Sequence, residues 1–342
     1  MPPRPAARAS PSRRARNDAL IASTAGATVP AVRELSEYDR DVVADLRARD
    51  EFFWLDLDSP DDATLQAIAD QLRWHPLAVE DTREFNQRPK LDDYQDHVLL
   101  VFYGMRPTGE REDAMPLEVH IYVHGGYVVT IHRGCSELAR IRERAERRTP
   151  ESEQGLVYMI LDGLTDTFFP VLEAIDDEID VLESEITLDA RHHQVVRMFG
   201  LKRHLLALRR VIAPMRDIFA TRLDALEDLP GLQPGSRDYF RDVWDHLTRI
   251  AEQIDSYRDV LSSAMDVYLS SVSNRVNAVM KQLTVIATIF LPLTFVTGFF
   301  GQNFGWLVER VDTAVAFWGL GMGSLIVFCA VLFAFFKQRG WL

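Results

Sequence analysis

The stretch that decides the fold is LTVIATIFLPLTFVTGFF, which runs from Leu283 to Phe300 without a charged side chain. A second uncharged run, TAVAFWGLGMGSLIVFCAVLFAFF, extends from Thr313 to Phe336. A helix needs about 20 mainly apolar residues to cross a bilayer, and each run meets that length. Soluble helices seldom stay free of charge for so long, so we expect two membrane-spanning helices, over residues 283–303 and 313–336.

The basic residues beside these runs predict the orientation of the two spans. They lie on the side away from the connector 304–312, at Arg275, Lys281, Lys337 and Arg339. By the positive-inside rule, both ends of the chain, including the basic tail 337–342, are expected in the cytoplasm and the connector outside the plasma membrane. Residues 1–29 lack a secretory apolar core and are broken by prolines, so we expect a disordered tail there, with a transit peptide as the alternative.

The composition excludes several classes of protein. The 342 residues carry 51 acidic against 38 basic side chains, a net charge of −13, whereas proteins that bind nucleic acid usually carry a basic excess. The two cysteines, Cys135 and Cys329, predict neither a disulfide framework nor a cysteine zinc site. The sequence contains no Gly-Lys pair and hence no Walker A loop, and it has no hydrolase motif, so ATP-driven pumping and an enzyme are both unsupported.

The N-terminal part of the chain is predicted to fold as a cytoplasmic α/β domain over residues 30–150. Its strand-like runs are Glu51–Leu57, His97–Met105 and Leu117–His132. The last run is expected to be a hairpin that turns at Gly125-Gly126, and a helix is expected over Asp61–Leu72. Residues 151–235 are predicted to be wholly helical. The fold class is therefore an α+β membrane protein.

A stretch without glycine or proline, from Ser236 to Leu291, can form one helix of 56 residues, about 80 Å long. We expect a stalk over 236–282 that continues as the first span. Apolar or aromatic residues recur along it at intervals of three and four, at Phe240, Val243, Leu247, Ile250, Ile254, Tyr257, Leu261, Ala264 and Tyr268. Such a stripe is typical of packed parallel helices, and equally of a helix that lies on its own domain. Because it runs directly into a membrane span, we expect it at the centre of an oligomer.

The first predicted span continues the same spacing. Two membrane helices cannot enclose a water-filled path, so transport would require several copies. The face that the spacing marks is uncharged and mostly small or polar; it comprises Asn277, Met280, Thr284, Ala287, Leu291, Thr294 and Gly298, with Leu283 beside them. Such a face suits a hydrated divalent cation, and Mg²⁺ in particular gives up its water reluctantly. Packing of small residues between helices in lipid is the alternative.

The segment PLTFVTGFFGQNF, from Pro292 to Phe304, resembles the CorA family of divalent-cation channels, whose signature there is Gly-Met-Asn. Further matching stretches are HPLAVED (His75–Asp81), QRPK (Gln87–Lys90), IDDEIDVLE (Ile175–Glu183), YFRDVWDH (Tyr239–His246) and the run Val267–Phe295. The resemblance extends from about residue 50 to the end of the chain. It implies a funnel-shaped homopentamer in lipid, in which five stalks continue as pore-lining first spans inside a ring of second spans.

The resemblance also implies roles for individual residues. A selectivity filter is expected at Gly301, Gln302 and Asn303, where Gly301 permits a tight turn and Asn303 contacts the hydrated ion. Because glutamine replaces the methionine of the signature, the transported ion stays open among Mg²⁺, Zn²⁺, Co²⁺ and Ni²⁺, as does proton coupling. The acidic positions that bind the ion in the cytoplasm and hold the pore shut match Glu80, Asp81 and Asp242. Mg²⁺ is thus the expected cargo and the expected regulator.

Two further interpretations concern other classes of site and function. Along one predicted strand, zinc-ligand types recur at every second position, at Glu118, His120 and His124, with Tyr122 among them. We favour the alternative that these four side chains form the solvent-facing side of a strand whose other side is apolar. A membrane-anchored coiled-coil scaffold without transport is the remaining function class. It would not need Asn277, Thr294, Gly301 and Asn303 in register.

Overall fold

The structure is a computed structural model, and it describes residues 32–94, 96–106, 115–147, 153–222, 237–302, 305–309 and 313–340. The expected disordered tail and the predicted filter residue Asn303 lie outside the described residues. The chain divides into two compact units. The first contains the described residues of Met1–Ile179 and Gly200–Asp259, and the second those of Asp180–Phe199 and Val260–Leu342.

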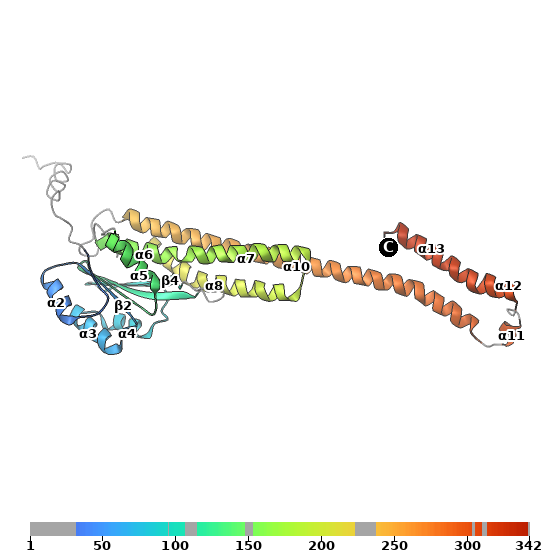
Figure 1. Cartoon of the computed structure of the whole chain (residues 1–342), viewed down its shortest axis with the longest axis horizontal. Helices are drawn as coiled ribbons and strands as arrows, with labels where there is room; N and C mark the ends of the chain where they lie inside the picture. Colours follow the sequence, from blue (N-terminus) through green and yellow to red (C-terminus); the bar gives the residue numbers. More distant parts are fainter. Residues whose placement is uncertain are drawn as a thin grey trace, which may run out of the picture. The chain divides into compact units, whose positions relative to one another are not determined.

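The first unit is built on a mixed sheet (Figure 1). The sheet has six strands in the order β1-β2-β6-β5-β4-β3. Its strands are β1 (Arg33–Leu35), β2 (Phe53–Asp58), β3 (Lys90–Asp93), β4 (Val98–Met105), β5 (Pro116–Val123) and β6 (Tyr127–His132). The three strands β1, β2 and β6 run parallel, and the remaining pairs are antiparallel. The three strand-like runs of the sequence are therefore confirmed as β2, β4 and the hairpin of β5 and β6. Gly125 turns that hairpin with a positive φ of 60°, a conformation that glycine adopts readily.

Helices cover both faces of the sheet (Figure 1). The helices of the chain up to residue 221 are α2 (Arg40–Ala48), α3 (Asp62–Leu72), α4 (Pro76–Glu84), α5 (Ser136–Arg147), α6 (Glu153–Asp166), α7 (Phe168–Leu188) and α8 (His192–Thr221). Asp61 caps α3 by accepting a hydrogen bond from the Thr64 amide at 2.8 Å. His75 caps α4, and Pro76 occupies the first position of that helix. At Gly104 a β-carbon would come within 2.9 Å of the Leu164 side chain, so glycine lets α6 approach β4 closely.

Strand β5 is buried on both of its faces, which contradicts the predicted solvent-facing side. Glu118 is 9% exposed, and His120 and Tyr122 are 0% exposed. The reason is tertiary: the Tyr122 ring stacks on Trp74, which directly precedes α4, with ring centroids 3.6 Å apart. The alternation of polar and apolar residues along β5 therefore indicated two buried faces, one apolar and one hydrogen-bonded. It did not indicate one face in the core and one in solvent.

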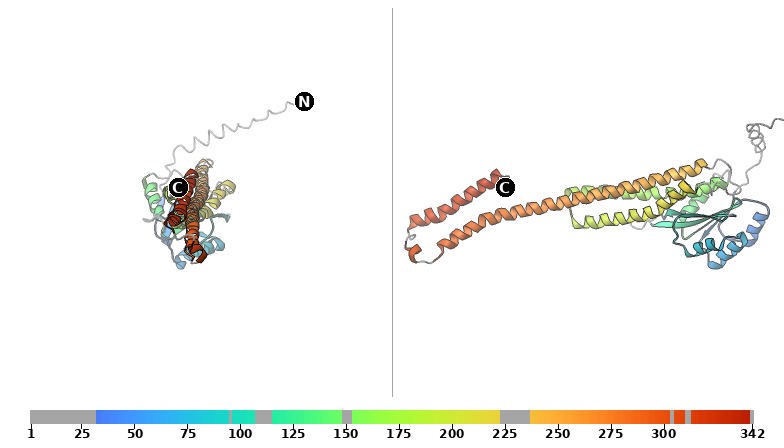
Figure 2. Two further views of the ribbon diagram at one scale, coloured as in Figure 1. Left: turned by 90° about the vertical axis from the view of Figure 1, so that its right-hand side faces the viewer. Right: turned by 180° about the vertical axis from the view of Figure 1, so that it is seen from behind.

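The long helix predicted from Ser236 is confirmed as α10 (Arg237–Phe300), 64 residues that continue through Pro292. Its apolar stripe is buried within the single chain, with 0–3% exposure at Phe240, Val243, Leu247, Ile250, Ile254, Leu261 and Ala264. Within the first unit, α10 lies beside α7 and α8 (Figures 1 and 2), and the Phe240 ring stacks on Phe219 of α8. These seven positions belong to the chain's own core, so the prediction that they form the centre of an oligomer is wrong, whereas Tyr257 and Tyr268 of the predicted stripe are only partly buried.

The second unit contains the C-terminal part of α10, the turn between α7 and α8, and the last helical segments. These segments are α11 (Gly305–Val308), α12 (Ala314–Ala316), the π-helix η2 (Phe317–Gly323) and α13 (Ser324–Gln338). Arg275 of α10 donates to the Ala190 carbonyl at 3.1 Å and to the Asp189 carboxylate, which fixes the α7–α8 turn to α10. The guanidinium groups of Arg191 and Arg275 hold the pKa of Asp189 below its usual value.

Three described helical stretches are long and apolar enough to cross a membrane, namely Gln154–Leu188, Asp238–Phe300 and Ala314–Gln338. They differ in how much of their apolar surface the protein itself covers. In the first, 61% of the apolar window is buried, against 6% in each of the other two. The first stretch therefore belongs to the folded core, whereas the other two leave their apolar surface uncovered in a single chain.

Candidate functional site

The eight side chains of the predicted pore face lie on the C-terminal part of α10 and are all exposed in the single chain. They are Asn277, Met280, Leu283, Thr284, Ala287, Leu291, Thr294 and Gly298. Exposure alone does not define a face, because most neighbouring residues of this apolar stretch are also exposed. What distinguishes these eight is their position relative to the part of α10 that is covered.

One narrow face of the same segment is covered. Val285 is 7% exposed, and the partly covered positions continue from it at intervals of three and four, at Lys281, Ile289, Pro292 and Val296. On α13 the matching set is Leu325, Cys329, Leu332 and Phe336, and Phe336 is 3% exposed. Lys281 donates to the Gly340 carbonyl at 2.7 Å, which joins the two helices at the end of α13. At about 100° per residue, the predicted pore face lies roughly opposite the face toward α13.

The threonine hydroxyls of the predicted pore face already donate hydrogen bonds to backbone carbonyls of α10. The Thr284 hydroxyl donates to the Met280 carbonyl at 2.8 Å, and the Thr294 hydroxyl donates to the Phe290 carbonyl at 2.8 Å. Each hydroxyl oxygen therefore presents acceptor lone pairs outward. Acceptors suit a hydrated cation, because the water molecules around it point their hydrogens away from the ion.

The predicted filter begins where α10 ends. The Gly301 amide donates to the Thr297 carbonyl at 3.0 Å, and the Gln302 amide donates to the Phe299 carbonyl at 3.3 Å. Gly301 is not among the described glycines with a positive φ, so the tight turn expected there does not depend on a left-handed backbone at Gly301. A β-carbon at Gly301 would instead lie 3.1 Å from the Thr297 carbonyl oxygen, which is tight.

Two of the three predicted regulatory acids, Glu80 and Asp81, line a pocket of about 540 Å³ beside α4 and β3. The Lys90 ammonium lies in this pocket, 2.6 Å from an Asp81 carboxylate oxygen and 2.9 Å from an Asp92 carboxylate oxygen. The predicted acid Asp242 does not line it. Within one chain, the structure therefore brings Glu80 and Asp81 together and places Asp242 in other surroundings.

Asp242 lies on α10, where it faces a tyrosine and a histidine. The Tyr158 hydroxyl donates to Asp242 at 2.9 Å, and the His246 imidazole lies 3.9 Å from the other carboxylate oxygen of Asp242. Burial and the hydrogen bond to Asp242 raise the pKa of Tyr158, so its hydroxyl stays protonated and donates. His246 in turn connects Asp242 to a group of metal-ligand side chains.

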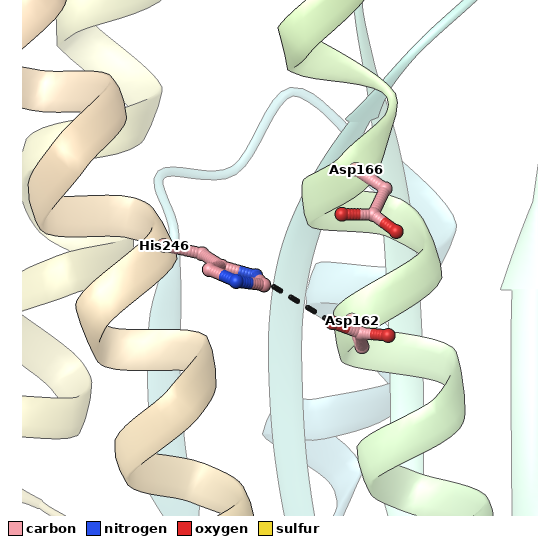
Figure 3. A group of neighbouring side chains, drawn as sticks. All are labelled: Asp162, Asp166 and His246. Atoms are coloured by element: carbon pink, nitrogen blue, oxygen red, sulfur yellow. Dashed lines mark ion pairs between the residues drawn. The ribbon is translucent and has the colours of Figure 1, made fainter.

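That group is Asp162, Asp166 and His246, whose ligand atoms all lie within 4.8 Å of one another (Figure 3). It is the one group of three histidine, cysteine or acidic ligands that comes together in the part of the chain that the structure describes. Asp162 and Asp166 stand one turn apart on α6, and His246 approaches from α10, with Nδ1 3.6 Å from Asp162. Two carboxylates and an imidazole are a donor set that divalent metal ions accept.

The electrostatics of this group favour a bound cation. Burial raises the pKa of Asp162, the Asp166 carboxylate adds to the shift, and the charges of His246 and Arg144 oppose it. Asp162 is 6% exposed, so little water reaches its carboxylate. A divalent cation between the two carboxylates would relieve their repulsion.

Sequence reasoning missed Asp162 and Asp166 and quoted His246 only as part of YFRDVWDH. The available signal was two pairs of ligand types four residues apart, Asp162 with Asp166 and Asp242 with His246, since such pairs share one side of a helix. What the sequence could not supply was the crossing of α6 and α10 that brings the two pairs together.

The predicted zinc-ligand types on β5 do not form such a group. The Glu118 carboxylate accepts the Asn86 and Gln87 amides at 2.6 and 3.0 Å and lies 2.7 Å from His120 Nε2. His120 Nδ1 lies 2.9 Å from the Thr82 hydroxyl. His124 instead stacks on Tyr127, with ring centroids 4.7 Å apart. Glu118 and His120 fasten β5 to α4 and the loop after it, and hydrogen bonds occupy both His120 nitrogens.

The chain is similar to known proteins over most of its length. The family model described as "CorA-like Mg2+ transporter protein" matches residues 49–338. The chain is 34% identical over 286 residues to the cobalt/magnesium transport protein CorA of Thermotoga maritima, covering 81% of this chain and 80% of that protein. It is 34% identical over 300 residues to the putative metal ion transporter YfjQ of Bacillus subtilis, covering 85% and 90%.

The fold is similar to that of a solved full-length structure. The complete structure of the CorA magnesium transporter from Methanocaldococcus jannaschii aligns with a TM-score of 0.73 at 23% identity. The alignment covers 84% of this chain and 91% of the other. The long helix and the sheet unit are therefore part of a known architecture.

Proposed function

Because this chain belongs to the CorA-like Mg²⁺ transporter family, we propose that it carries Mg²⁺ into the cell through a pore built from five copies. It is a divalent-cation transporter in a membrane and not an enzyme. The observation that carries the finer proposal is the polar, uncharged face of α10 opposite its contact with α13. In a single copy this face of α10 is exposed, so further copies are needed to enclose a pore beside it.

In this proposal the C-terminal part of α10 and the segment from α12 to α13 cross the plasma membrane, with both chain ends in the cytoplasm. Copies of α10 turn their Asn277-to-Gly298 faces toward a common axis, and α13 covers each helix from outside. No ATP is needed, because a doubly charged ion gains about 4.6 kcal/mol on entering at 100 mV inside-negative. The protein supplies acceptor oxygens that fit an ion keeping its water.

Asn303 is proposed to complete the path at the outer mouth. Gly301 and Gln302 end α10 immediately before it, so five copies would present a ring of amide groups around the axis. Side-chain carbonyls in such a ring accept hydrogen bonds from the water around the ion. The amide of Gln302 would add polar groups beside that ring.

Closure is proposed to depend on cations bound outside the membrane, at Glu80, Asp81 and Asp242 and at the neighbouring group of Asp162, Asp166 and His246. Within each of these two places the carboxylates repel one another when no cation is bound, and a divalent cation relieves the repulsion. Loss of the cation would therefore loosen the packing around α6, α4 and α10, and a local charge change of this kind can bias an assembly with two states.

A second candidate cargo follows from the imidazole of His246. Mg²⁺ prefers oxygen ligands only, whereas Zn²⁺, Co²⁺ and Ni²⁺ readily accept imidazole nitrogen. The group of Asp162, Asp166 and His246 would therefore suit a transition-metal ion as regulator, and the relative from Thermotoga maritima is named for cobalt as well as magnesium. Transport of Zn²⁺, Co²⁺ or Ni²⁺, with or without proton coupling, is the alternative proposal.

The test is uptake into liposomes that contain the purified full-length protein. An inside-negative potential should drive Mg²⁺ entry without ATP, and a competition series with Co²⁺, Ni²⁺ and Zn²⁺, repeated with a pH gradient, identifies the preferred ion and any coupling. Mass measurement of the complex in detergent should give five copies. If a fully assembled complex conducted no divalent cation, the membrane-anchored scaffold would replace the transport proposal.

A further inference from the structure

The acidic pocket beside α4 contains a positively charged side chain, Lys90, among its carboxylates. Four carboxylates and two basic groups line it, which leaves an excess of two negative charges: Glu80, Asp81, Asp92 and Asp93 against Lys90 and Arg222. Leu77, Leu91 and Tyr94 complete the wall. The excess equals the charge of one divalent cation, and Lys90 is the basic group that stands between the carboxylates.

The Lys90 ammonium is held by carboxylates from two different elements. Asp81 comes from α4, and its Oδ2 lies 2.6 Å from Lys90 Nζ. Asp92 lies two residues after Lys90 on β3, hence on the same face of that strand, and its Oδ2 lies 2.9 Å from the ammonium. The three side chains are only 22–35% exposed, so these contacts are partly shielded from water.

The side chain of Lys90 stays protonated and positively charged. Burial works against it, but the hydrogen bonds and charges of Asp81 and Asp92 outweigh burial and raise the pKa of Lys90 above its ordinary value. The ammonium is therefore present throughout the physiological pH range, so pH does not switch this contact.

The backbone that leads to Lys90 is also fixed. Asn86 and Gln87, just before it, donate their amides to Glu118, which is buried on β5. Lys90 itself begins β3, which pairs with β4. The ammonium is thus delivered to the pocket by a segment anchored to the sheet, unlike a lysine on a free surface.

We propose that Lys90 is a built-in competitor of the regulatory divalent cation. Its ammonium takes the place between Asp81 and Asp92 that a divalent cation needs, and a rising cation concentration displaces it. Lys90 thereby sets the concentration at which the pore closes. The inference rests on the proposed function, in which Asp81 takes part in closure.

The direction of the effect follows from charge. A divalent cation must break two ion pairs to reach the carboxylates, and it must also bear repulsion from the ammonium that it moves aside. Removing the ammonium eliminates both obstacles. Because partly exposed ion pairs are individually weak, we expect a gain in cation affinity of about threefold to fivefold.

The experiment compares Lys90→Gln with Lys90→Arg and with Lys202→Gln in the full-length protein in liposomes. Lys202 lies on α8 and does not line the pocket. Mg²⁺ is varied on the side that carries the sheet unit while uptake from the other side is measured. Lys90→Gln should lower the half-closing Mg²⁺ concentration by about threefold to fivefold. Lys90→Arg keeps the charge and should stay near wild type, as should Lys202→Gln.

A direct binding measurement keeps the inference testable apart from gating. Mn²⁺ binding to the detergent-solubilised protein, followed by electron paramagnetic resonance, should be tighter in Lys90→Gln than in Lys90→Arg. Unchanged or weaker Mn²⁺ binding in an assembled Lys90→Gln complex would overturn the inference, because Lys90 would then be neutral to the cation or a support for Asp81. A wild-type protein that carries no divalent cation would refute the proposed function instead, and the Mn²⁺ comparison would still decide the role of Lys90.

Discussion

The two halves of α10 carry the same spacing of distinctive residues and have opposite environments. From Phe240 to Ala264 the repeating positions are mainly apolar, and seven of them are 0–3% exposed against the chain's own helices. From Asn277 to Gly298 the repeating positions are largely polar or small, and all are exposed. Regular spacing therefore shows that one side of a helix is distinct, but the residue types decide what that side contacts.

The difference has a simple physical origin. Large apolar side chains such as Phe240 and Leu247 gain by leaving water, and the nearest cover is the folded part of their own chain. Thr284 and Thr294 gain nothing comparable from burial, and their acceptor oxygens are best used against water or a hydrated ion. In the proposed function, one helix is thus structural along one half and lines the ion path along the other.

The strongest way to sharpen this comparison lies at the end of the exposed half, where Asn303 follows. Asn303→Ala should abolish selective uptake while the assembly stays intact. Five lost hydrogen bonds, each worth about 0.5–1.5 kcal/mol, correspond to a decrease in selective uptake of about a hundredfold or more. Uptake of Mg²⁺ and Co²⁺ into liposomes measures this. Unchanged uptake and selectivity would remove Asn303 from the filter.

Truncating one leucine in each half compares them on a common scale. Leu247→Ala should lower the free energy of unfolding by about 2–5 kcal/mol, because Leu247 is 0% exposed. Leu291→Ala makes the same chemical change at a side chain that is 72% exposed, and should alter stability by less than about 0.5 kcal/mol. Thermal unfolding of the purified protein measures both. Equal destabilisation would break the contrast between the halves.

The buried half also carries Asp242, which faces away from the apolar stripe toward Tyr158 and His246. Asp242→Ala should raise the cation concentration that half-closes the pore by about tenfold, because one attractive charge is lost. Asp245→Ala, three residues further on and exposed, is the matched control. Cation-dependent inhibition of uptake measures the shift. If both variants close like wild type, Asp242 is an ordinary surface acid; the same test applies to Asp81→Ala.

Within the exposed half, two threonines test whether the face matters. Thr294→Val should reduce Mg²⁺ uptake about threefold to tenfold, because a hydroxyl acceptor is replaced by a methyl group in each copy. Thr288 makes the same type of bond to the carbonyl four residues before it, and lies about 120° around the helix from Thr294 but only about 40° from Thr284, at the edge of the predicted pore face. Because it lies at the edge of that face, Thr288→Val should reduce uptake less than Thr294→Val. A similar loss in both variants would mean that the spacing selected the wrong face.

The smallest effect is expected at the middle position of the filter. Gln302→Met restores the methionine of the signature and removes a polar side chain that is exposed where α10 ends. Flux should persist, and the ratio of Mg²⁺ to Co²⁺ uptake should shift by about twofold to fivefold. A competition series with the two ions measures the ratio. An identical ratio would show that Gln302 does not contact the ion path.

Several features could be predicted because they depend on neighbouring residues alone. Charge-free runs of sufficient length, the strands β2, β4, β5 and β6, and the continuity of α10 all follow from local pattern and from the absence of helix breakers. The strands β1 and β3 were missed, since they have only three and four residues and no alternation. Their pairing with β2 and β4 comes from the sheet rather than from local preference.

The candidate site also has a part that could be predicted from the sequence and a part that could not. The residue types that a divalent cation requires, including Glu80, Asp81 and Asp242, were visible from their resemblance to a family. Their partners were not, because Lys90 between Asp81 and Asp92, and His246 between Asp162 and Asp242, depend on how β3 meets α4 and how α6 crosses α10. No spacing along one chain encodes a distance between two elements.

The sequence by itself determined where the apolar and polar faces of each helix lie, because side-chain direction follows from a fixed rotation per residue. Only the tertiary structure decided which of those faces the chain covers itself. It buried the stripe from Phe240 to Ala264, enclosed both faces of β5, and left the face from Asn277 to Gly298 uncovered. Burial is a property of what packs on a face, and that partner comes from distant parts of the chain.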